Sequence, residues 1–261
     1  MLGAIVGDVI GSVHEWAATK TKDFPLFVPQ STFTDDSVLT VAVAEWILTG
    51  QNLVDLLHTY TDAYPGRGYG SMFYRWASAR LREPYNSFGN GAAMRVSPVG
   101  FAFETMEEVL AWSKLSAEVT HNHPEGIRGA QATAAAIYLA RRVQDKEQIR
   151  RTIESQFEYD LSGRLEQIRP TYAFNETCRQ TVPQALAAFL ESTSYEDAIR
   201  NAISLGGDAD TLACITGGIA DAYYGGTPPN LAGPVYAMLD KRLAAVVDRF
   251  QERFGLVLPE A

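Results

Sequence analysis

The chain has 261 residues, of which 46% are hydrophobic and 20% are charged, and its net charge is −9. This composition is ordinary for a globular protein and excludes disordered and collagen-like classes, while the length fits one domain over residues 1–261. A net charge of −9 without any run of Lys or Arg also argues against a general nucleic-acid binder.

Membrane and disulfide-stabilised classes are also disfavoured. Apolar stretches such as residues 37–48 are shorter than the roughly 20 residues that cross a bilayer. The first residues lack a basic leader and reach Asp8 where a signal peptide would still be apolar. Two cysteines, Cys178 and Cys214, do not indicate a disulfide framework. We expect no membrane contact and a cytoplasmic protein.

The hydrophobic spacing is helical along almost the whole chain and predicts an all-α fold. Residues 161–172 are polar and are predicted to form a loop. The four tryptophans, Trp16, Trp46, Trp76 and Trp112, are expected in the core. The predicted helices span residues 2–17, 35–49, 52–63, 70–81, 91–103, 106–117, 126–143, 146–157, 174–191, 195–204, 209–224 and 231–254.

The first predicted helix carries two acids, Asp8 and Glu15, seven residues apart. Two helical turns separate them, which places both carboxylates on one face of the helix. Gly7 and Gly11 permit close approach of another helix or a ligand. The segment is read either as part of a polar site or as a glycine-mediated helix crossing with two solvated acids.

The second predicted helix begins with Thr34, Asp35 and Asp36, followed by an almost entirely apolar stretch. One such side chain is enough to cap the free amides of a first helical turn. Two adjacent carboxylates in a partly buried corner repel each other unless a cation neutralises them. Helix capping and metal binding both remain open for this cluster taken alone.

Two further segments are read as ligand loops. Residues 87–95 are rich in glycine and lead into a helix, so their backbone amides can hold phosphate oxygens, with Phe88 offering a face for stacking. His121 and His123 alternate in residues 119–126 and do not share a helical face, which argues against a shared metal. At least one of these histidines is expected to cap a helix or to hold a hydrogen bond.

A second acidic cluster follows Gly206 and Gly207 and repeats the first arrangement. Asp208, Asp210 and Thr211 stand at the start of another apolar helix. Together the two clusters supply hard oxygen ligands, which Mg²⁺ or Mn²⁺ prefers, and no sulfur or paired histidine site for zinc. The repetition favours metal binding over capping.

At this point the chain resembles the ADP-ribosylglycohydrolase family. The resemblance spans most of the chain and rests on five segments that occur in the family's order: Gly7-Asp8 with Gly11 and Glu15, residues 34–37, residues 89–95, Thr120-His121 with Gly126 and Gly129, and residues 206–211.

The resemblance implies an all-α fold, a compact single-domain orthogonal helical bundle, with two Mg²⁺ ions, or Mn²⁺, at the bottom of an ADP-ribose cleft. Thr34, Asp35, Asp36, Asp208, Asp210 and Thr211 match metal ligands, and Ser87, Phe88, Gly89, Asn90, Gly91 and His121 match positions that bind ADP-ribose. Glu15 and Asp36 are the candidate catalytic carboxylates. The implied reaction is hydrolysis of the glycosidic linkage between ADP-ribose and an acceptor on a protein, a nucleic acid or a small metabolite.

One segment departs from the family. Some members carry an Asp-Gly pair after the third or fourth helix, whereas residues 64–72 here contain no carboxylate. This departure suggests a different acceptor or general acid, with Arg67 and Tyr69 facing the substrate. Two alternatives stay open: a non-catalytic ADP-ribose-binding protein, and a helical prenyl-diphosphate enzyme, although the latter usually places its acids on helix faces rather than at helix starts.

Overall fold

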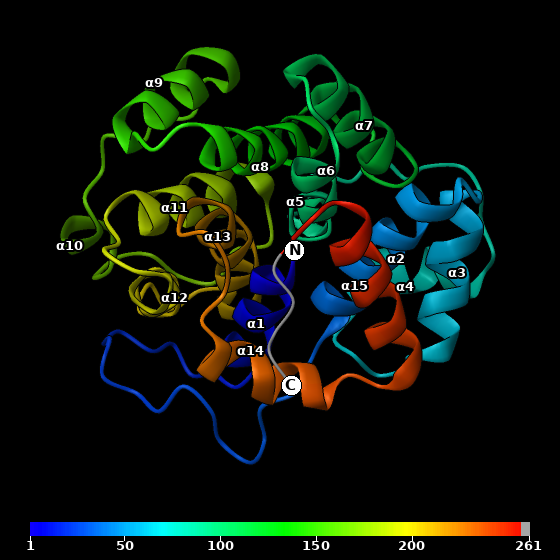
Figure 1. Ribbon diagram of the computed structural model, residues 1–261, viewed down its shortest axis with the longest axis horizontal. Helices are drawn as coiled ribbons and strands as arrows, with labels where there is room; N and C mark the ends of the chain where they lie inside the picture. The colour runs from blue at the N-terminus through cyan, green and yellow to red at the C-terminus, as the bar shows by residue number, and fades with distance from the viewer. Residues whose placement is uncertain (257–261) are drawn as a thin grey trace.

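A computed structural model describes residues 1–256 and confirms the predicted all-α class, with fifteen helices and no β-strand in that range. The elements form one compact bundle (Figure 1). The helices are α1 (Leu2–Gly11), α2 (Asp35–Thr49), α3 (Leu53–Ala63), α4 (Ser71–Ser78), α5 (Gly91–Met94), α6 (Ser97–Ala102), α7 (Met106–Glu118), α8 (Pro124–Arg142), α9 (Lys146–Phe157), α10 (Leu165–Ile168), α11 (Cys178–Leu190), α12 (Tyr195–Ile203), α13 (Ala209–Tyr223), α14 (Pro229–Met238) and α15 (Lys241–Arg253).

The centre of the bundle is the antiparallel pair α1 and α13. Gly3, Gly7 and Gly11 lie at intervals of four on α1, and a Cβ atom at Gly7 would stand 2.0 Å from the carbonyl oxygen of Ala213. A Cβ at Gly11 would stand 2.5 Å from the Cα of Asp210. The predicted close approach at Gly7 and Gly11 is therefore a helix–helix crossing, and it brings the end of α1 beside the start of α13.

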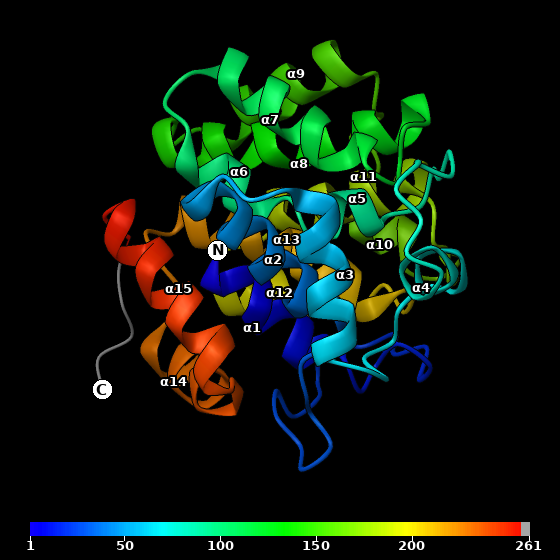
Figure 2. The ribbon, with the colours of Figure 1, turned by 90° about the vertical axis from the view of Figure 1, so that its right-hand side faces the viewer.

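The other helices surround this pair. Figures 1 and 2 show α7, α8 and α9 along one side, with α2, α3 and α15 on another. Helix α8 contacts α6, α7, α9, α11 and α13, while α2 packs against α3 and α15. In the described residues, no helix has both the length and the apolar character required to span a bilayer.

The first predicted helix is shorter than expected, which overturns the placement of Glu15. Helix α1 ends at Gly11, and residues 12–18 form turns that end at Ala18, whose φ of 47° is incompatible with a continuing helix. The Ser12 hydroxyl donates to the carbonyl oxygen of Val9 at 2.9 Å. Asp8 and Glu15 therefore do not share a helical face, and Glu15 is positioned by the turn.

Two other predicted helices are each divided into two. The predicted helix 91–103 breaks at Arg95–Val96 into α5 and α6, because Pro98 occupies the first turn of a new helix and has no amide hydrogen to continue the old one. The predicted helix 231–254 breaks where Asp240 caps α15, accepting from the amides of Arg242 at 2.8 Å and Leu243 at 3.0 Å.

Two boundaries near the middle of the chain also differ. The predicted loop 161–172 contains the four-residue helix α10. The helix predicted from residue 174 begins only at Cys178, after an irregular segment at residues 172–176. That segment borders the cavity described below.

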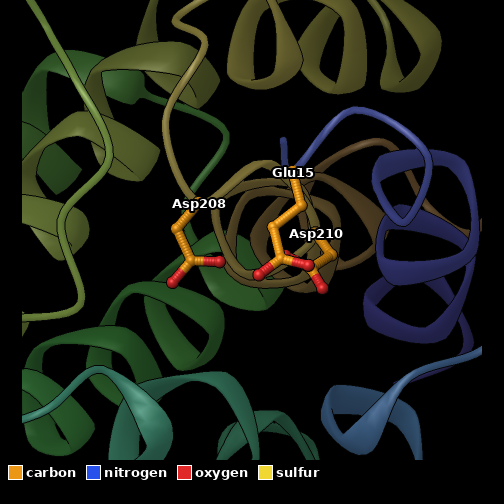
Figure 3. Close-up of side chains that lie close together, drawn as sticks. All are labelled: Glu15, Asp208 and Asp210. Carbon is orange, nitrogen blue, oxygen red and sulfur yellow. The ribbon is translucent and has the colours of Figure 1, made fainter. Parts of the chain in front are cut away.

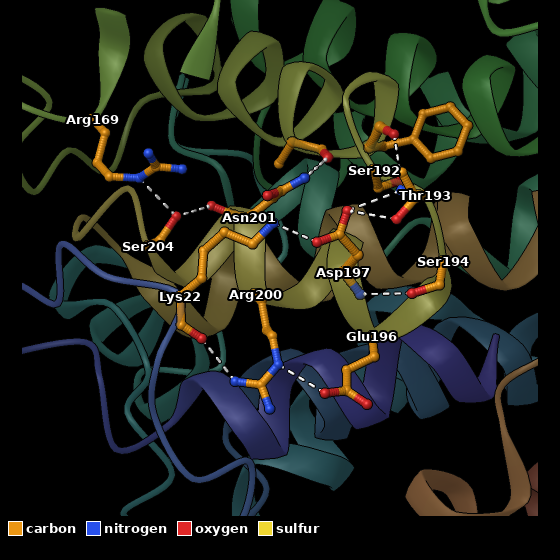
Figure 4. A network of polar contacts seen from close by, with 12 residues as sticks. Lys22, Arg169, Ser192, Thr193, Ser194, Glu196, Asp197, Arg200, Asn201 and Ser204 are labelled. Atoms are coloured by element: carbon orange, nitrogen blue, oxygen red, sulfur yellow. Dashed lines mark hydrogen bonds and ion pairs between the residues drawn. The ribbon is translucent and has the colours of Figure 1, made fainter. Parts of the chain in front are cut away.

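The segment between α1 and α2, residues 12–34, is a long irregular excursion held by α12 (Figure 4). Arg200 donates to the carbonyl oxygens of Lys22 at 2.8 Å and Phe24 at 2.9 Å. Lys22 forms an ion pair with Asp197. These contacts anchor the excursion that carries Glu15.

The tryptophans do not all lie in the core. Trp76 is buried, and Trp46 and Trp112 are partly buried against the core with ring centroids 4.7 Å apart. Trp16 is 78% exposed, which contradicts the prediction for this residue. Its ring stacks on Phe174 at 5.0 Å, because the turn after α1 carries it to the surface.

Candidate active site

Asp8 organises the start of α2 from its place near the end of α1. Its fully buried carboxylate accepts from the amide of Thr34 at 2.9 Å, the hydroxyl of Thr34 at 2.7 Å, the amide of Ser37 at 3.1 Å and the hydroxyl of Ser37. Burial raises its pKa, although these hydrogen bonds act in the opposite direction. The sequence placed Asp8 only on one face of a helix. In the structure, its hydrogen bonds to Thr34 and Ser37 hold the first acidic cluster in place.

The first cluster combines capping with free carboxylate oxygens. Thr34 caps α2, since its hydroxyl oxygen accepts from the amide of Asp36 at 3.2 Å. The amide of Asp35 donates to the carbonyl oxygen of Arg67 at 2.7 Å. Asp36 is 2% exposed, and its Oδ1 atom has no hydrogen-bond partner. Thr34 therefore caps α2, and the side chains of Asp35 and Asp36 are not needed for capping.

The second cluster lies opposite, at the start of α13. Asp208 stands in the cap position but makes no capping hydrogen bond, and its Oδ2 accepts from Asn90 Nδ2 at 2.7 Å. The Thr211 amide donates to Asp210 Oδ1 at 3.0 Å. The Thr211 hydroxyl donates to Asp36 Oδ2 at 3.4 Å. This last contact joins the two clusters, so the prediction that they lie together is met in the structure.

Glu15 completes the acidic group from the turn after α1. One oxygen each of Glu15, Asp208 and Asp210 can be chosen so that all three lie within 4.8 Å of one another. Figure 3 shows the three carboxylates directed toward a common region. Glu15 is half-buried, whereas the two aspartates are buried. A turn, and not a face shared with Asp8, therefore brings Glu15 beside the two aspartates.

The pKa values of the carboxylates in this group are raised above their usual range. Burial is the main cause, and repulsion from neighbouring carboxylates adds to it. The pKa of Glu15 is raised to about 7 by burial and by Asp210, and burial raises that of Asp208 to about 6. Burial and repulsion from Asp210 hold the pKa of Asp35 and of Asp36 well above the usual range.

The donor set fits a hard divalent cation. Within residues 1–256, no Lys or Arg forms an ion pair with any carboxylate of the group. The buried Oδ1 of Asp36 has no hydrogen-bond partner among the described residues. Mg²⁺ and Mn²⁺ take such ligands. A cation would supply the missing counter-charge.

A cavity of about 290 Å³ opens over the acidic group. Its lining includes the acids Glu15, Asp35, Asp36, Asp208 and Asp210 together with Thr211, but not Thr34. All six predicted substrate-binding residues line the same cavity: Ser87, Phe88, Gly89, Asn90, Gly91 and His121. The predicted metal-binding and ligand-binding segments therefore meet at one site.

The glycine-rich loop is tied to the irregular segment before α11. The amide of Asn90 donates to the carbonyl oxygen of Glu176 at 2.7 Å, and the amide of Cys178 donates to that of Phe88 at 3.0 Å. Phe88 is 51% exposed and faces His123 at 5.4 Å between ring centroids. His123 caps α8, as one histidine was expected to do, by accepting from the amide of Glu125 at 3.1 Å.

The structure also assigns cavity walls that the sequence did not indicate. Arg67 and Tyr69 do not line the cavity, which contradicts their predicted placement. Arg67 donates to the Thr32 hydroxyl at 2.8 Å and the Phe33 carbonyl oxygen at 3.1 Å, and the Tyr69 hydroxyl donates to the Tyr64 carbonyl oxygen at 2.9 Å. The wall is formed instead by residues including Gly68, Gly70, Met72, Phe73, Phe174 and Glu176.

Comparison with known proteins gives a consistent picture. A family model described as ADP-ribosylglycohydrolase matches residues 1–257. The ADP-ribosylhydrolase ARH3 of Xenopus tropicalis is 27% identical, over 86% of each chain. The ADP-ribosylarginine hydrolase Tri1 of Pseudomonas putida is 26% identical, over 88% of this chain and 71% of that protein. A solved ADP-ribosylglycohydrolase-related protein complex shares the fold, with a TM-score of 0.66, 24% identity and 97% coverage of both chains.

Proposed function

The chain belongs to the ADP-ribosylglycohydrolase family and is therefore a glycohydrolase, and from this premise we propose that it cleaves the glycosidic linkage between ADP-ribose and an acceptor with two Mg²⁺ ions. The observation that carries the metal requirement is the buried, unpartnered Asp36 Oδ1 in a group of carboxylates without a counter-charge. Such a group is costly to keep ionised unless a cation binds.

Six residues would hold the ions: Thr34, Asp35, Asp36, Asp208, Asp210 and Thr211. When bound, divalent ions supply positive charge that orients hydroxyl groups and favours ionisation of water. Asp8 keeps Thr34 at the start of α2, and Asn90 keeps Asp208 turned toward the cavity. The chain thus positions both clusters through hydrogen bonds that leave Asp36 Oδ1 without a partner.

Glu15 is the proposed proton carrier. Its pKa of about 7 allows it both to accept and to donate a proton near neutral pH, which suits a general acid–base group. Its half-buried carboxylate lies at the cavity wall, beside Asp210 and Asp208. Asp36 and its neighbours provide negative charge next to the anomeric carbon, where cleavage passes through an oxocarbenium-like state.

The opposite wall would hold the rest of the ligand. Ser87 to Gly91 present a small glycine surface, and His121 closes this wall just after the end of α7. The amides of Ser87, Gly89 and Asn90 already donate within the chain, so they are not free to hold phosphate oxygens. Phe88 is exposed enough to stack on a sugar or base. In this arrangement the diphosphate and adenosine would lie away from the carboxylates, and the distal ribose would lie beside them.

The decisive experiment is a mass-spectrometric panel of ADP-ribosylated arginine, serine, DNA, RNA and small metabolites, incubated with Mg²⁺ or with EDTA. We expect free ADP-ribose from at least one substrate with Mg²⁺ and no product in EDTA. The Glu15→Gln variant should bind ADP-ribose but should not hydrolyse any of the ADP-ribosylated substrates. Equal cleavage in EDTA would contradict the metal requirement, and full turnover by Glu15→Gln would contradict the role of Glu15.

A further inference from the structure

Arg95 is a buried cation without an anionic partner. It is 0% exposed, and its Nη2 donates to the carbonyl oxygen of Ser116 at 2.7 Å and to the hydroxyl of Thr120 at 2.8 Å. Its Nε and Nη1 atoms are buried without hydrogen-bond partners in the described part of the chain. Burying a guanidinium in this way is costly, so its position calls for an explanation beyond packing.

The hydrogen bond from Arg95 determines which way the Thr120 hydroxyl points. A guanidinium can only donate, so the Thr120 oxygen is the acceptor in that contact. The other contact of this hydroxyl among residues 1–256 is with His121 Nδ1, at 2.8 Å. Among the described residues, His121 Nδ1 is the one acceptor in contact with this hydroxyl, and a buried hydroxyl hydrogen without an acceptor is costly. This cost favours a hydroxyl that donates to an unprotonated Nδ1 over one that accepts from both neighbours.

The state of the imidazole ring follows from this arrangement. With Nδ1 accepting, the ring hydrogen of a neutral His121 lies on Nε2. Burial and the nearby charge of Arg95 both lower the pKa of His121 well below its usual value, which keeps the ring neutral. The three side chains form a chain of contacts, Arg95 to Thr120 to His121, that sets one tautomer.

The Nε2 atom faces the glycine-rich loop at the cavity wall. A Cβ atom at Gly91 would stand 3.1 Å from Nε2, and one at Gly89 would stand 3.6 Å from it. These two positions carry no side chain, so a ligand oxygen can approach the ring. No residue among those described accepts a hydrogen bond from Nε2, although His121 is only 4% exposed.

We propose that Arg95 and Thr120 are positioning residues that hold His121 neutral with its hydrogen on Nε2, so that it donates to an oxygen of bound ADP-ribose. The identity of the ligand rests on the proposed function, whereas the tautomer does not. Thr120 transmits the orientation, and Arg95 both fixes Thr120 and opposes a second proton on the ring.

The first test reads the tautomer directly. Nitrogen-15 NMR of the ligand-free protein at neutral pH should show a protonated Nε2 and an unprotonated Nδ1 for His121. A hydrogen on Nδ1, or an imidazolium, would overturn the proposal. Because this measurement uses no substrate, it decides the tautomer even if ADP-ribose proves not to be the ligand.

The second test uses matched threonine variants in calorimetric titrations with ADP-ribose. Thr120→Val should weaken binding by about tenfold, the effect of one well-placed hydrogen bond, and Thr120→Ser should restore it. Thr133→Val is the control, because Thr133 is also fully buried and its hydroxyl has no partner. Unchanged affinity in Thr120→Val, with the control also unchanged, would overturn the proposal.

A double-mutant cycle separates positioning from general packing. In a His121→Ala background, Thr120→Val should produce no further loss of affinity, because its effect passes through the imidazole. A loss as large as in the wild-type background would assign Thr120 a structural role and contradict the proposal. Absence of ADP-ribose binding by the wild type would contradict the proposed function instead, and the NMR result would still stand.

Discussion

The two ends of the cavity differ in charge: one is lined by carboxylates and the other by uncharged groups. At one end, Glu15, Asp36, Asp208 and Asp210 lie close together, and burial, with repulsion between carboxylates, raises their pKa values. At the other end, the lining is a glycine-rich loop and a neutral imidazole, with the charge of Arg95 buried behind it. We propose that a bound cation neutralises the acidic end, whereas contacts within the chain arrange the neutral end.

Asn90 links the two ends. It belongs to the glycine-rich loop, and its Nδ2 donates to Asp208 Oδ2 at 2.7 Å and to Thr181 Oγ1 at 3.1 Å. The loop that borders the ligand wall therefore also orients a candidate metal ligand. Changes at each end should nevertheless have separable effects, since metal binding depends on the carboxylates and ligand placement depends on the loop.

The largest effect is expected from Asp36→Asn, which removes a charge from the acidic end. Turnover with Mg²⁺ should fall on the order of a thousandfold, because both ion binding and charge stabilisation depend on this carboxylate. In EDTA the variant should melt no lower than the wild type, since carboxylate repulsion is relieved. Asp62→Asn, at an exposed ion pair with Arg80, is the control and should retain activity. Wild-type turnover by Asp36→Asn would remove Asp36 from the site.

Gly91→Ala should disturb the neutral end alone. Its Cβ would lie 3.1 Å from His121 Nε2 and occupy the approach to the ring. We expect KM to rise on the order of 10- to 100-fold through overpacking, with Mg²⁺ affinity unchanged in calorimetry. Gly233→Ala is the matched control, because nothing lies within 4 Å of its Cβ position. A change in Mg²⁺ affinity in Gly91→Ala would show that the two ends are not separable.

The pH dependence of stability should distinguish the ends without mutation. The folded pKa values of Glu15, about 7, and Asp208, about 6, lie above those of an unfolded chain. The folded protein therefore binds more protons between about pH 4 and 7, and these carboxylates contribute progressively less stability as pH rises through that window. Buried histidines with lowered pKa values act in the opposite direction.

Comparing melting temperatures in EDTA and in Mg²⁺ isolates the carboxylates, because the histidine contribution is common to both conditions. The stabilisation by Mg²⁺ should grow as pH rises from about 5 to 7, since protons and cations compete for the same oxygens. A Mg²⁺ effect that is independent of pH across this window would mean that the ion binds elsewhere.

Phe88→Ala should have the smallest effect. The ring is 51% exposed, so the melting temperature should hardly change. If it stacks on the ligand, KM should rise about fivefold while kcat stays constant, the scale of one aromatic contact. Phe88→Tyr, which keeps the ring, should restore the wild-type KM. Unchanged KM in Phe88→Ala would remove the aromatic face from the binding wall.

The sequence was sufficient for the parts of the site that depend on local pattern. Acids at the starts of apolar helices indicated α2 and α13, and the order of the five segments indicated one shared site with the glycine-rich loop. The helical prenyl-diphosphate alternative is set aside by the family match. These predictions succeeded because they depend on residue type and on position at the start of a helix, both of which can be read from the local sequence.

The parts that failed depend on where the backbone turns. Glu15 reaches Asp210 only because α1 ends at Gly11, and helical spacing from Asp8 could not foresee that turn. Arg67 contacts Thr32 and Phe33 instead of the cavity, since the end of the segment before α2 lies against it. The tautomer that we propose for His121 could not be predicted from local sequence either, because it depends on Arg95, which is distant in sequence.

The exposed Trp16, stacked on Phe174, can serve as an intrinsic fluorescence probe. Trp16 directly follows Glu15, and its indole is 78% exposed, whereas the other three tryptophans are buried or partly buried. A water-soluble quencher such as iodide will therefore reach this one indole first. Changes in its quenching report on the turn that carries the proposed proton carrier, in real time and without any attached label.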